Sequence, residues 1–189
     1  MSRFRKLIHL AMAWLPALGW LVSYQLELAL AVALLLASAV VELARRRWQW
    51  VNQLLWRLLP FAFRSGEDRR VLGSTWFAVG ALVTLVLFGR DIGGTALLFL
   101  VWGDPAAEFV GRRRGQPGRR KTLVGSLGCL LACLLAACVG TSLGGLSPLV
   151  ALTGAVVATL AERWSPPPDD NVWVPILAGL VMWVTQWMV

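Results

Sequence analysis

The segment LVGSLGCLLACLLAACV, residues 123–139, contains no charged side chain. A helix needs about 20 largely apolar residues to cross a bilayer, and fewer when flanking polar side chains reach back to the interface. The segment also holds all three cysteines, Cys129, Cys133 and Cys138. Their apolar context indicates small packing residues rather than a disulfide framework or a metal site. This stretch therefore predicts a membrane-spanning helix.

The composition of the whole chain agrees with that prediction. Of 189 residues, 58% are hydrophobic and 15% are charged, and the mean hydropathy is +0.67. A water-soluble domain of this length would need far more polar surface, which excludes that class. Eleven tryptophans beside one tyrosine suit anchoring at membrane interfaces. The net charge of +8 lies in loops between apolar segments, without a nucleic-acid-binding motif, so we expect no nucleic-acid partner.

Six more apolar segments have a length that suits a membrane span. The predicted spans are residues 7–22, 26–41, 71–88, 92–110, 123–139, 143–160 and 172–189. Only Tyr24 and Gln25 separate the first two, which predicts a tight helical hairpin there, and Pro16 interrupts its first helix. The sequence thus predicts an all-α polytopic bundle of about seven transmembrane helices. It forms a single domain over residues 1–189, of unknown oligomeric state.

The segment between the second and third spans has a different pattern. Apolar residues recur there at helical spacing: Val51, Leu54, Leu55, Leu58, Leu59 and Ala62. Trp48 and Trp56 flank this face, which predicts an amphipathic helix lying in the membrane interface.

The distribution of basic residues predicts the topology. With seven spans, the N-terminus and the segments 42–70, 111–121 and 162–171 share one side, and Arg90 is the only Lys or Arg on the other. The positive-inside rule then places the N-terminus and these loops in the cytoplasm and the C-terminus on the opposite side.

The fourth span ends with two carboxylates, Asp104 and Glu108, four residues apart and so on one helix face. Carboxylates at the edge of an apolar span are costly, and they usually face a polar cavity. We expect Pro105 to open the helix at Asp104 and free backbone carbonyls. In the alternative reading, Glu108 pairs with Arg112 and only ends the span.

A glycine-rich basic loop follows, and the fifth span begins just beyond Lys121. Glycines let backbone N–H groups approach an oxyanion, a helix N-terminus attracts anions, and a lysine adds a mobile positive charge. The spacing is not that of a Walker A loop. The preceding Asp104 suggests a metal–phosphate site with Mg²⁺, although the loop might otherwise be an ordinary basic connection.

The last cytoplasmic loop repeats this arrangement of acidic helix ends. Glu162 closes the sixth span, and Asp169, Asp170 and Asn171 open the seventh. These carboxylates could complete a divalent-cation site, although Asp169 could instead be only an N-cap. The single histidine, His9, suits either a phosphate contact or a buried structural role.

In their order, these motifs resemble the CTP-dependent lipid-alcohol kinases: the phytol, dolichol (polyprenol) and diacylglycerol kinase group, related to the phosphatidate cytidylyltransferases. The matching motifs are Arg5-Lys6-x-x-His9; Glu42-Leu-Ala-Arg45 with Asn52; Arg64-x-x-Glu67; Trp102-x-Asp104-x-Ala106-Ala107; Gly111-Arg112-x-x-Gly115; Lys121-Thr122; Gly125-Ser126-x-Gly128; and Asp170-Asn171-x-x-x-Pro175. The resemblance covers most of the chain. Pro105 departs from it, because the relatives usually carry a small polar residue at that position.

The resemblance implies transfer of the γ-phosphate of CTP to the hydroxyl of a long-chain isoprenoid alcohol or of diacylglycerol. The implied catalytic residues are Asp104, Glu108 and Lys121, and the implied Mg²⁺ ligands are Asp104, Glu162 and Asp170. The implied nucleotide and phosphate contacts are Gly111, Arg112, Gly115, Lys121, Thr122, Gly125, Ser126, Gly128 and Asn171. Further polar site candidates are Arg5, Lys6, His9, Glu42, Asn52, Arg64 and Glu67. The implied partners are a nucleoside triphosphate and a membrane lipid.

Two alternatives remain open at this point. A cytidylyltransferase acting on a lipid phosphate would use the same cations and a similar loop, but it would release pyrophosphate. A non-catalytic membrane protein or transporter would use the basic loops only to set its topology. The polar residues gather at one membrane face rather than along a path through several spans, which favours an enzyme at the interface.

Overall fold

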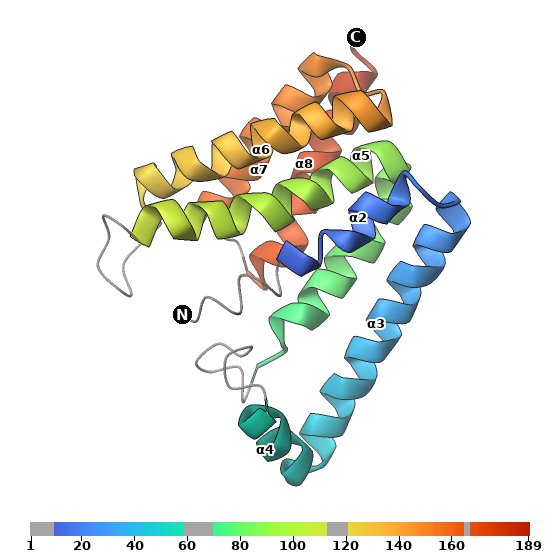
Figure 1. Ribbon diagram of the computed structural model, residues 1–189, viewed down its shortest axis with the longest axis vertical. Helices are drawn as coiled ribbons and strands as arrows, with labels where there is room; N and C mark the ends of the chain where they lie inside the picture. Colours follow the sequence, from blue (N-terminus) through green and yellow to red (C-terminus); the bar gives the residue numbers. More distant parts are fainter. Residues whose placement is uncertain (1–9, 59–69, 113–120, 165–166) are drawn as a thin grey trace.

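The computed structural model describes residues 10–58, 70–112, 121–164 and 167–189, and all the regular secondary structure in these ranges is helical. The helices are α2 (Trp14–Gly19), α3 (Tyr24–Arg47), α4 (Gln49–Leu58), α5 (Gly73–Arg112), α6 (Leu123–Gly144), α7 (Pro148–Trp164) and α8 (Asp170–Gln186). Figure 1 shows α5 at the centre, with α6, α7 and α8 on one side and α2 and α3 on the other.

Helix α5 bends sharply at Gly89, which divides it into a first arm (residues 73–88) and a second arm (residues 90–112). Gly89 has φ 73° and ψ −173°, a backbone conformation that side chains disfavour. Close to the bend, a Cβ at Gly93 would lie 3.1 Å from the carbonyl oxygen of Thr84, so the arms touch there before they diverge. The two arms match the separately predicted spans 71–88 and 92–110.

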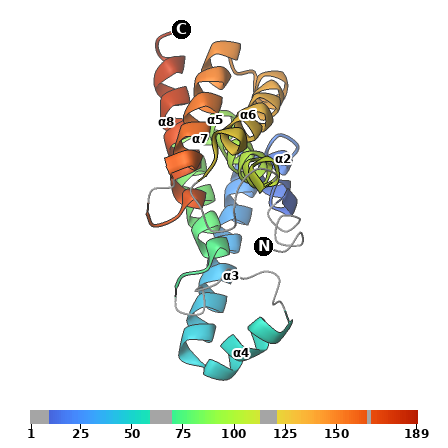
Figure 2. The same ribbon diagram turned by 90° about the vertical axis from the view of Figure 1, so that its left-hand side faces the viewer.

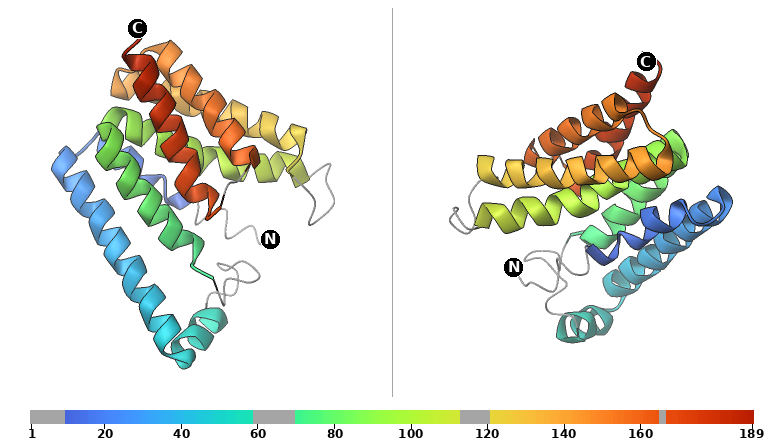
Figure 3. Two further views of the ribbon diagram at one scale, coloured as in Figure 1. Left: turned by 180° about the vertical axis from the view of Figure 1, so that it is seen from behind. Right: turned by 45° about the horizontal axis from the view of Figure 1, so that its top comes forward.

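The first arm of α5 packs against α8, and the second arm packs against α6 as well as against α7 and α8 in the core. The first arm runs beside α8, where Gly80 lies against the backbone of Asn171 and Phe88 lies against Gly179 (Figure 3). The second arm runs beside α6, where a Cβ at Gly103 would lie 2.9 Å from Sγ of Cys129. The bend at Gly89 therefore controls how the α6 side of the bundle is placed relative to the α8 side.

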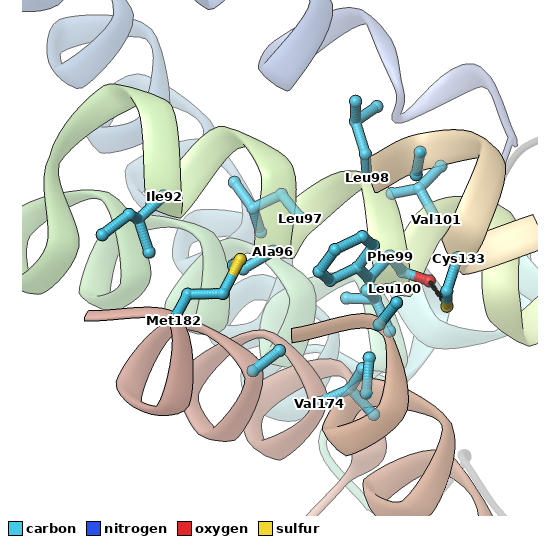
Figure 4. Close-up of a cluster of buried hydrophobic side chains, with 14 of the residues drawn as sticks. Ile92, Ala96, Leu97, Leu98, Phe99, Leu100, Val101, Cys133, Val174 and Met182 are labelled. Atoms are coloured by element: carbon cyan, nitrogen blue, oxygen red, sulfur yellow. Dashed lines mark hydrogen bonds between the residues drawn. The ribbon is translucent and has the colours of Figure 1, made fainter. Parts of the chain in front are cut away.

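The core lies where the second arm meets α6, α7 and α8. Phe99 is buried among these helices, with Met182 and Val174 of α8 nearby and its carbonyl oxygen accepting a hydrogen bond from Sγ of Cys133 at 3.6 Å (Figure 4). Burial of Cys133 and Cys129 agrees with the packing role predicted for the cysteines, whereas Cys138 is exposed.

The predicted N-terminal hairpin is present, with a turn between α2 and α3 and Ser23 as the N-cap of α3. Its first helix is shorter than the predicted span 7–22. Within the described residues of that span, Met12 and Ala13 form a turn, and α2 has only 6 residues. The second helix extends beyond the predicted range 26–41 at both ends.

The predicted amphipathic helix is also present, as α4, although it has no buried residue. It contacts mainly α3, and Figures 1 and 2 show it projecting away from the other helices. Trp48 and Trp50 are 51% and 64% exposed, as expected for side chains that anchor a helix at an interface. Leu59 and Ala62, the last residues of the predicted apolar face, lie outside the described residues.

Three of the described helices, α3, α5 and α6, are long and apolar enough to cross a membrane by length and composition. Helices α7 and α8 have 17 residues each and overlap the predicted spans 143–160 and 172–189. The helical class is thus confirmed and three helices qualify as candidate membrane spans, while the count of seven spans stays a prediction.

Candidate active site

Lys121 lies directly before α6 and joins the end of α7 to the start of α8. Its Nζ is 2.7 Å from Oε1 of Glu162 and 3.2 Å from Oδ2 of Asp170, and it also donates to the carbonyl oxygen of Glu162. Asp104, near the end of α5, is close enough to act on the ammonium electrostatically. The three carboxylates predicted to bind a metal therefore gather around one lysine. We call these four residues the Lys121 cluster.

The electrostatics of the cluster keep Lys121 charged. Burial alone would lower the pKa of Lys121, but the negative charges of Asp170 and Glu162, with a smaller contribution from Asp104, outweigh it and raise the pKa above its usual value. Glu162 is buried, so Lys121 supplies the positive charge that its carboxylate needs in that position.

The cluster fits a divalent cation by its chemistry but does not form a ready metal cage. Within the described ranges, no three His, Cys, Asp or Glu side chains are placed to hold a metal ion together. Mg²⁺ usually takes one or two protein carboxylates and completes its shell with water and substrate phosphates. Carboxylates from three helices around one ammonium suit an ion that arrives together with a triphosphate.

The carboxylates Asp104 and Glu108 lie on a continuous helix. Gly89 is the only residue of α5 with non-helical angles, and the helix runs through Pro105 to Arg112. The expectation that Pro105 opens the helix was wrong, because its missing N–H leaves only the carbonyl of Val101 without its helical donor. The two carboxylates lie on one face, as predicted, since a continuous helix brings residues four apart together.

The hydroxyls predicted to contact phosphate are bonded to the first turn of α6. Thr122 is the N-cap, and its Oγ1 accepts from the N–H of Gly125 at 3.0 Å. Ser126 Oγ donates to the carbonyl oxygen of Thr122 at 3.4 Å and accepts from Nη1 of Arg163 at 3.2 Å. Arg163 therefore brings a second cation to the N-terminus of α6.

Three predicted phosphate-binding glycines lie where α5 and α6 approach closely. A Cβ at Gly125 would lie 2.8 Å from the carbonyl oxygen of Ala107, and one at Gly111 would lie 3.0 Å from Oγ1 of Thr122. At Gly128 a Cβ would lie 2.8 Å from Cγ2 of Val110. The structure thus gives these glycines a packing role, and phosphate binding by their N–H groups stays a prediction.

The packing role can be tested at Gly128. Gly128→Leu should lower the melting temperature in detergent, because overpacking a tight helix contact costs about 1–3 kcal/mol. Cys138→Leu adds bulk to the exposed side of the same helix and should leave the melting temperature close to that of the wild type. Equal melting temperatures for both variants would contradict a close contact at Gly128.

At the start of α8, Asp169 and Asn171 both make hydrogen bonds within the protein. Asp169 is the N-cap, with its Oδ1 accepting from the N–H of Asn171 at 3.0 Å, which confirms the capping alternative for this residue. Asn171 donates from Nδ2 to the carbonyl oxygen of Gly73 at 3.2 Å, so its amide ties α8 to the first arm of α5. A nucleotide contact from Asn171 stays a prediction.

Comparison with curated proteins gives three relatives, each named CTP-dependent diacylglycerol kinase 1. The protein of Saccharomyces cerevisiae is 26% identical over 174 residues, which cover 76% of this chain and 58% of the relative. That of Eremothecium gossypii is also 26% identical over 174 residues, covering 76% and 53%. That of Schizosaccharomyces pombe is 24% identical over 162 residues, covering 76% and 73%.

The resemblance to CTP-dependent lipid kinases is confirmed. The chain spans little more than half the length of the first two relatives. No protein-family model and no solved structure matches it.

The other site candidates lie away from the Lys121 cluster or outside the described residues. Glu42 of α3 accepts from Nε of Arg45 at 2.9 Å and from the N–H of Leu72 at 3.3 Å, and Arg45 also donates to the carbonyl oxygen of Arg70. These bonds hold the end of α3 against the start of α5.

Asn52 lies on α4, which contacts mainly α3. The candidates outside the described residues are Arg5, Lys6, His9, Arg64, Glu67 and Gly115, together with the side chain of Arg112.

Sequence reasoning missed two charged residues, one beside the Lys121 cluster and one that is buried. Arg163 lies in the segment 162–171, and nothing in its spacing predicts the bond to Ser126. Glu27, at the start of α3, is buried and pairs with Arg90 at 3.7 Å. A carboxylate beside an apolar span is costly, and that signal could have identified Glu27.

Proposed function

We propose that this chain is a membrane-embedded lipid kinase that transfers the γ-phosphate of CTP to the hydroxyl of a membrane lipid. The observation that carries the proposal is the Lys121 cluster, in which carboxylates from α5, α7 and α8 surround one partly buried lysine. Similarity to three CTP-dependent diacylglycerol kinases supports CTP as the donor and diacylglycerol as the first acceptor to test. A long-chain isoprenoid alcohol, phytol or a polyprenol, is the second.

The chain's own residues would bind the phosphates and hold the metal ion in this reaction. Lys121 and Arg163 lie at the N-terminus of α6 and would neutralise phosphate charge there. Asp104, Glu162 and Asp170 would hold Mg²⁺, which supplies charge neutralisation and alignment of the triphosphate when it is bound. Arg112 and the N–H groups of the glycine-rich segment 111–121 would add further phosphate contacts.

The lipid hydroxyl needs a group that orients it and accepts its proton. Glu108 is one helical turn from Asp104 on the same face of α5, so either carboxylate could take this role. Phosphoryl transfer depends mainly on positioning and charge neutralisation, and this cluster has the charged groups to provide both.

The proposed topology brings the two substrates together. We propose seven spans, with the N-terminus and the basic loops in the cytoplasm, the C-terminus on the other side, and α4 in the interface. The ends of α5 and α7 and the starts of α6 and α8 meet at Lys121. A lipid hydroxyl from the cytoplasmic leaflet and a water-soluble nucleotide would meet there.

The product of the reaction separates the kinase from its nearest rival. Purified protein in detergent, given γ-labelled CTP, Mg²⁺ and diacylglycerol, phytol, farnesol or a polyprenol, should produce labelled lipid phosphate and CDP. Production of pyrophosphate from CTP with phosphatidate, and no labelled lipid, would identify a cytidylyltransferase instead. Neither product from folded protein that also fails to bind CTP would overturn both enzyme proposals.

A further inference from the structure

A second group of polar contacts lies at the other end of α6, between the α2–α3 turn and the bend in α5. Helix α6 runs from beside Lys121 to Gly144, where a Cβ would lie 3.3 Å from Cβ of Asp91. Three hydrogen bonds tie the turn to α5. Trp20 Nε1 donates to Oδ1 of Asp91 at 3.2 Å, and Arg90 Nη2 donates to the carbonyl oxygen of Val22 at 2.6 Å. Tyr24 Oη donates to the carbonyl oxygen of Leu85 at 2.6 Å. We call these contacts, together with the Glu27–Arg90 pair, the outer clip.

Glu27 is the buried centre of the outer clip. Its side chain is 1% exposed, and Oε2 lies 3.7 Å from Nε of Arg90. Neither carboxylate oxygen of Glu27 has a hydrogen-bond partner among the described residues, and Arg90 is the cation that pairs with it. The backbone of Gly19 lies against this carboxylate, where any Cβ would collide with it. Because an uncompensated buried charge is costly, Glu27 and Arg90 hold each other in place.

The outer clip binds α5 on both sides of its bend. Leu85, which accepts from Tyr24, belongs to the first arm, whereas Arg90 and Asp91 belong to the second arm. A segment that is bonded to both arms fixes the angle between them. The positive φ of Gly89 permits the bend, and the outer clip selects one bend geometry.

The two arms connect to different members of the Lys121 cluster. The first arm packs against α8, which begins at Asp170 and is tied to Gly73 by Asn171. The second arm carries Asp104 and packs against α6, which begins just after Lys121. A change in the angle between the arms therefore moves Asp104 relative to Asp170.

We propose that Glu27 and Arg90 are positioning residues for the phosphoryl transfer, acting from the far end of the bundle through the bend in α5. This inference rests on the proposed kinase function. Phosphoryl transfer depends on alignment, and a displacement of about 1 Å can reduce a rate by roughly 100-fold. The pair touches neither substrate, so its effect is on the geometry of the carboxylates.

The geometric part can be measured without any enzyme assay. Nitroxide labels at Ser74 and Phe109, both exposed, report the separation of the two arms by double electron–electron resonance. Cys138→Ser removes the exposed native thiol, and Cys129 and Cys133 are buried. In Glu27→Gln, the distance distribution should shift or broaden relative to the wild type, and Arg90→Lys, which keeps the charge, should change it less.

A matched control removes a helix–helix hydrogen bond elsewhere. Thr153→Val deletes the 3.2 Å contact between the hydroxyls of Thr153 and Thr185, which joins α7 to α8 and does not bridge the bend. It should leave the distance between the arms unchanged. If Glu27→Gln does not fold, Trp20→Phe removes the bond to Asp91, together with the ring atoms that lie against Gly94, and provides a second test of the outer clip.

The rate of phosphoryl transfer should change in the same variants that change the distance between the arms. Glu27→Gln should lower kcat roughly 10-fold to 100-fold, with the KM for the lipid unchanged and a higher Mg²⁺ concentration needed for half-maximal rate. Unchanged arm distances in both Glu27→Gln and Trp20→Phe would overturn the outer clip. Shifted distances with an unchanged kcat would overturn the positioning role. A wild-type protein that transfers phosphate to no acceptor would overturn the kinase proposal itself, whatever the distances show.

Discussion

Asp104→Asn is expected to lower the rate of phosphoryl transfer from CTP by roughly 100-fold to 1,000-fold, the range seen when one preorganised electrostatic group is removed. Asn keeps the shape of the side chain but loses the charge that a divalent cation needs. Asp104 lies near the end of the second arm and acts electrostatically on Lys121, so the substitution removes one of the three carboxylates of the cluster. Transfer of label from γ-labelled CTP to diacylglycerol in micelles measures the effect.

Asp169→Asn is the matched control for this prediction. It makes the same chemical change at the same end of the bundle, and Asn replaces Asp well as an N-cap. We expect near wild-type activity for Asp169→Asn. Partial recovery of Asp104→Asn at high Mg²⁺ would support a ligand role, whereas full activity at ordinary Mg²⁺ would remove Asp104 from the proposed site.

Lys121→Met is expected to lower both stability and activity. Methionine keeps much of the volume but leaves the buried carboxylate of Glu162 without its cation, and removing one partner of a buried pair costs about 3–5 kcal/mol. The lower end of that range is expected here, because the Lys121 side chain is still 33% exposed to solvent. The melting temperature should fall, and transfer from CTP should decrease because a phosphate contact is lost.

Lys121→Arg separates these two effects. Arginine keeps the positive charge beside Glu162 and Asp170, so most of the stability should return, but a planar fork does not replace a point charge at a phosphate. Activity should therefore recover less than the melting temperature. Equal recovery of both would indicate that Lys121 acts only on stability.

The pH dependence of the Lys121→Met effect follows from the direction of the pKa shift. The pKa of Lys121 is raised in the folded state by Asp170, Glu162 and Asp104 against the opposing effect of burial. Its stabilising contribution is fully present below the unfolded pKa of about 10.4 and is lost only as the pH rises through the higher folded value. The difference in melting temperature between Lys121→Met and the wild type should thus be the same at about pH 7 and about pH 9.

The hydrophobic segments predicted much of the fold, because length and hydropathy largely determine where membrane helices form. They separated residues 71–88 from 92–110, and Gly89 does divide the two arms there. They did not predict the short α2, because helix breaks depend on local backbone geometry that an apolar pattern does not record. They also did not predict which helices are neighbours, because each apolar face suits lipid as well as protein.

All four charged residues of the Lys121 cluster could be read from the sequence, but their pairing could not. Charged residues at the ends of spans are rare and costly, which identified Asp104, Glu162 and Asp170 before any geometry was known. Glycines close to a lysine suggested phosphate binding, yet Gly125 and Gly128 lie against α5, and a one-dimensional pattern does not distinguish these roles. The bond from Arg163 to Ser126 depends on how α6 and α7 pack together, and no motif encodes it.

The outer clip also bears on how the protein is made. Glu27 is synthesised well before Arg90, so in the proposed topology the first helical hairpin would enter the bilayer with a carboxylate that has no cation beside it. Such a hairpin is costly to retain, by about 2.5–3.5 kcal/mol if the charge lies at the bilayer centre and by less near the interface. Its stable insertion should depend on the arrival of the bend in α5, when Arg90 first reaches the far side. Ribosome-bound chains truncated before Arg90 should therefore keep the first hairpin accessible from the cytoplasm, and chains extended past it should not.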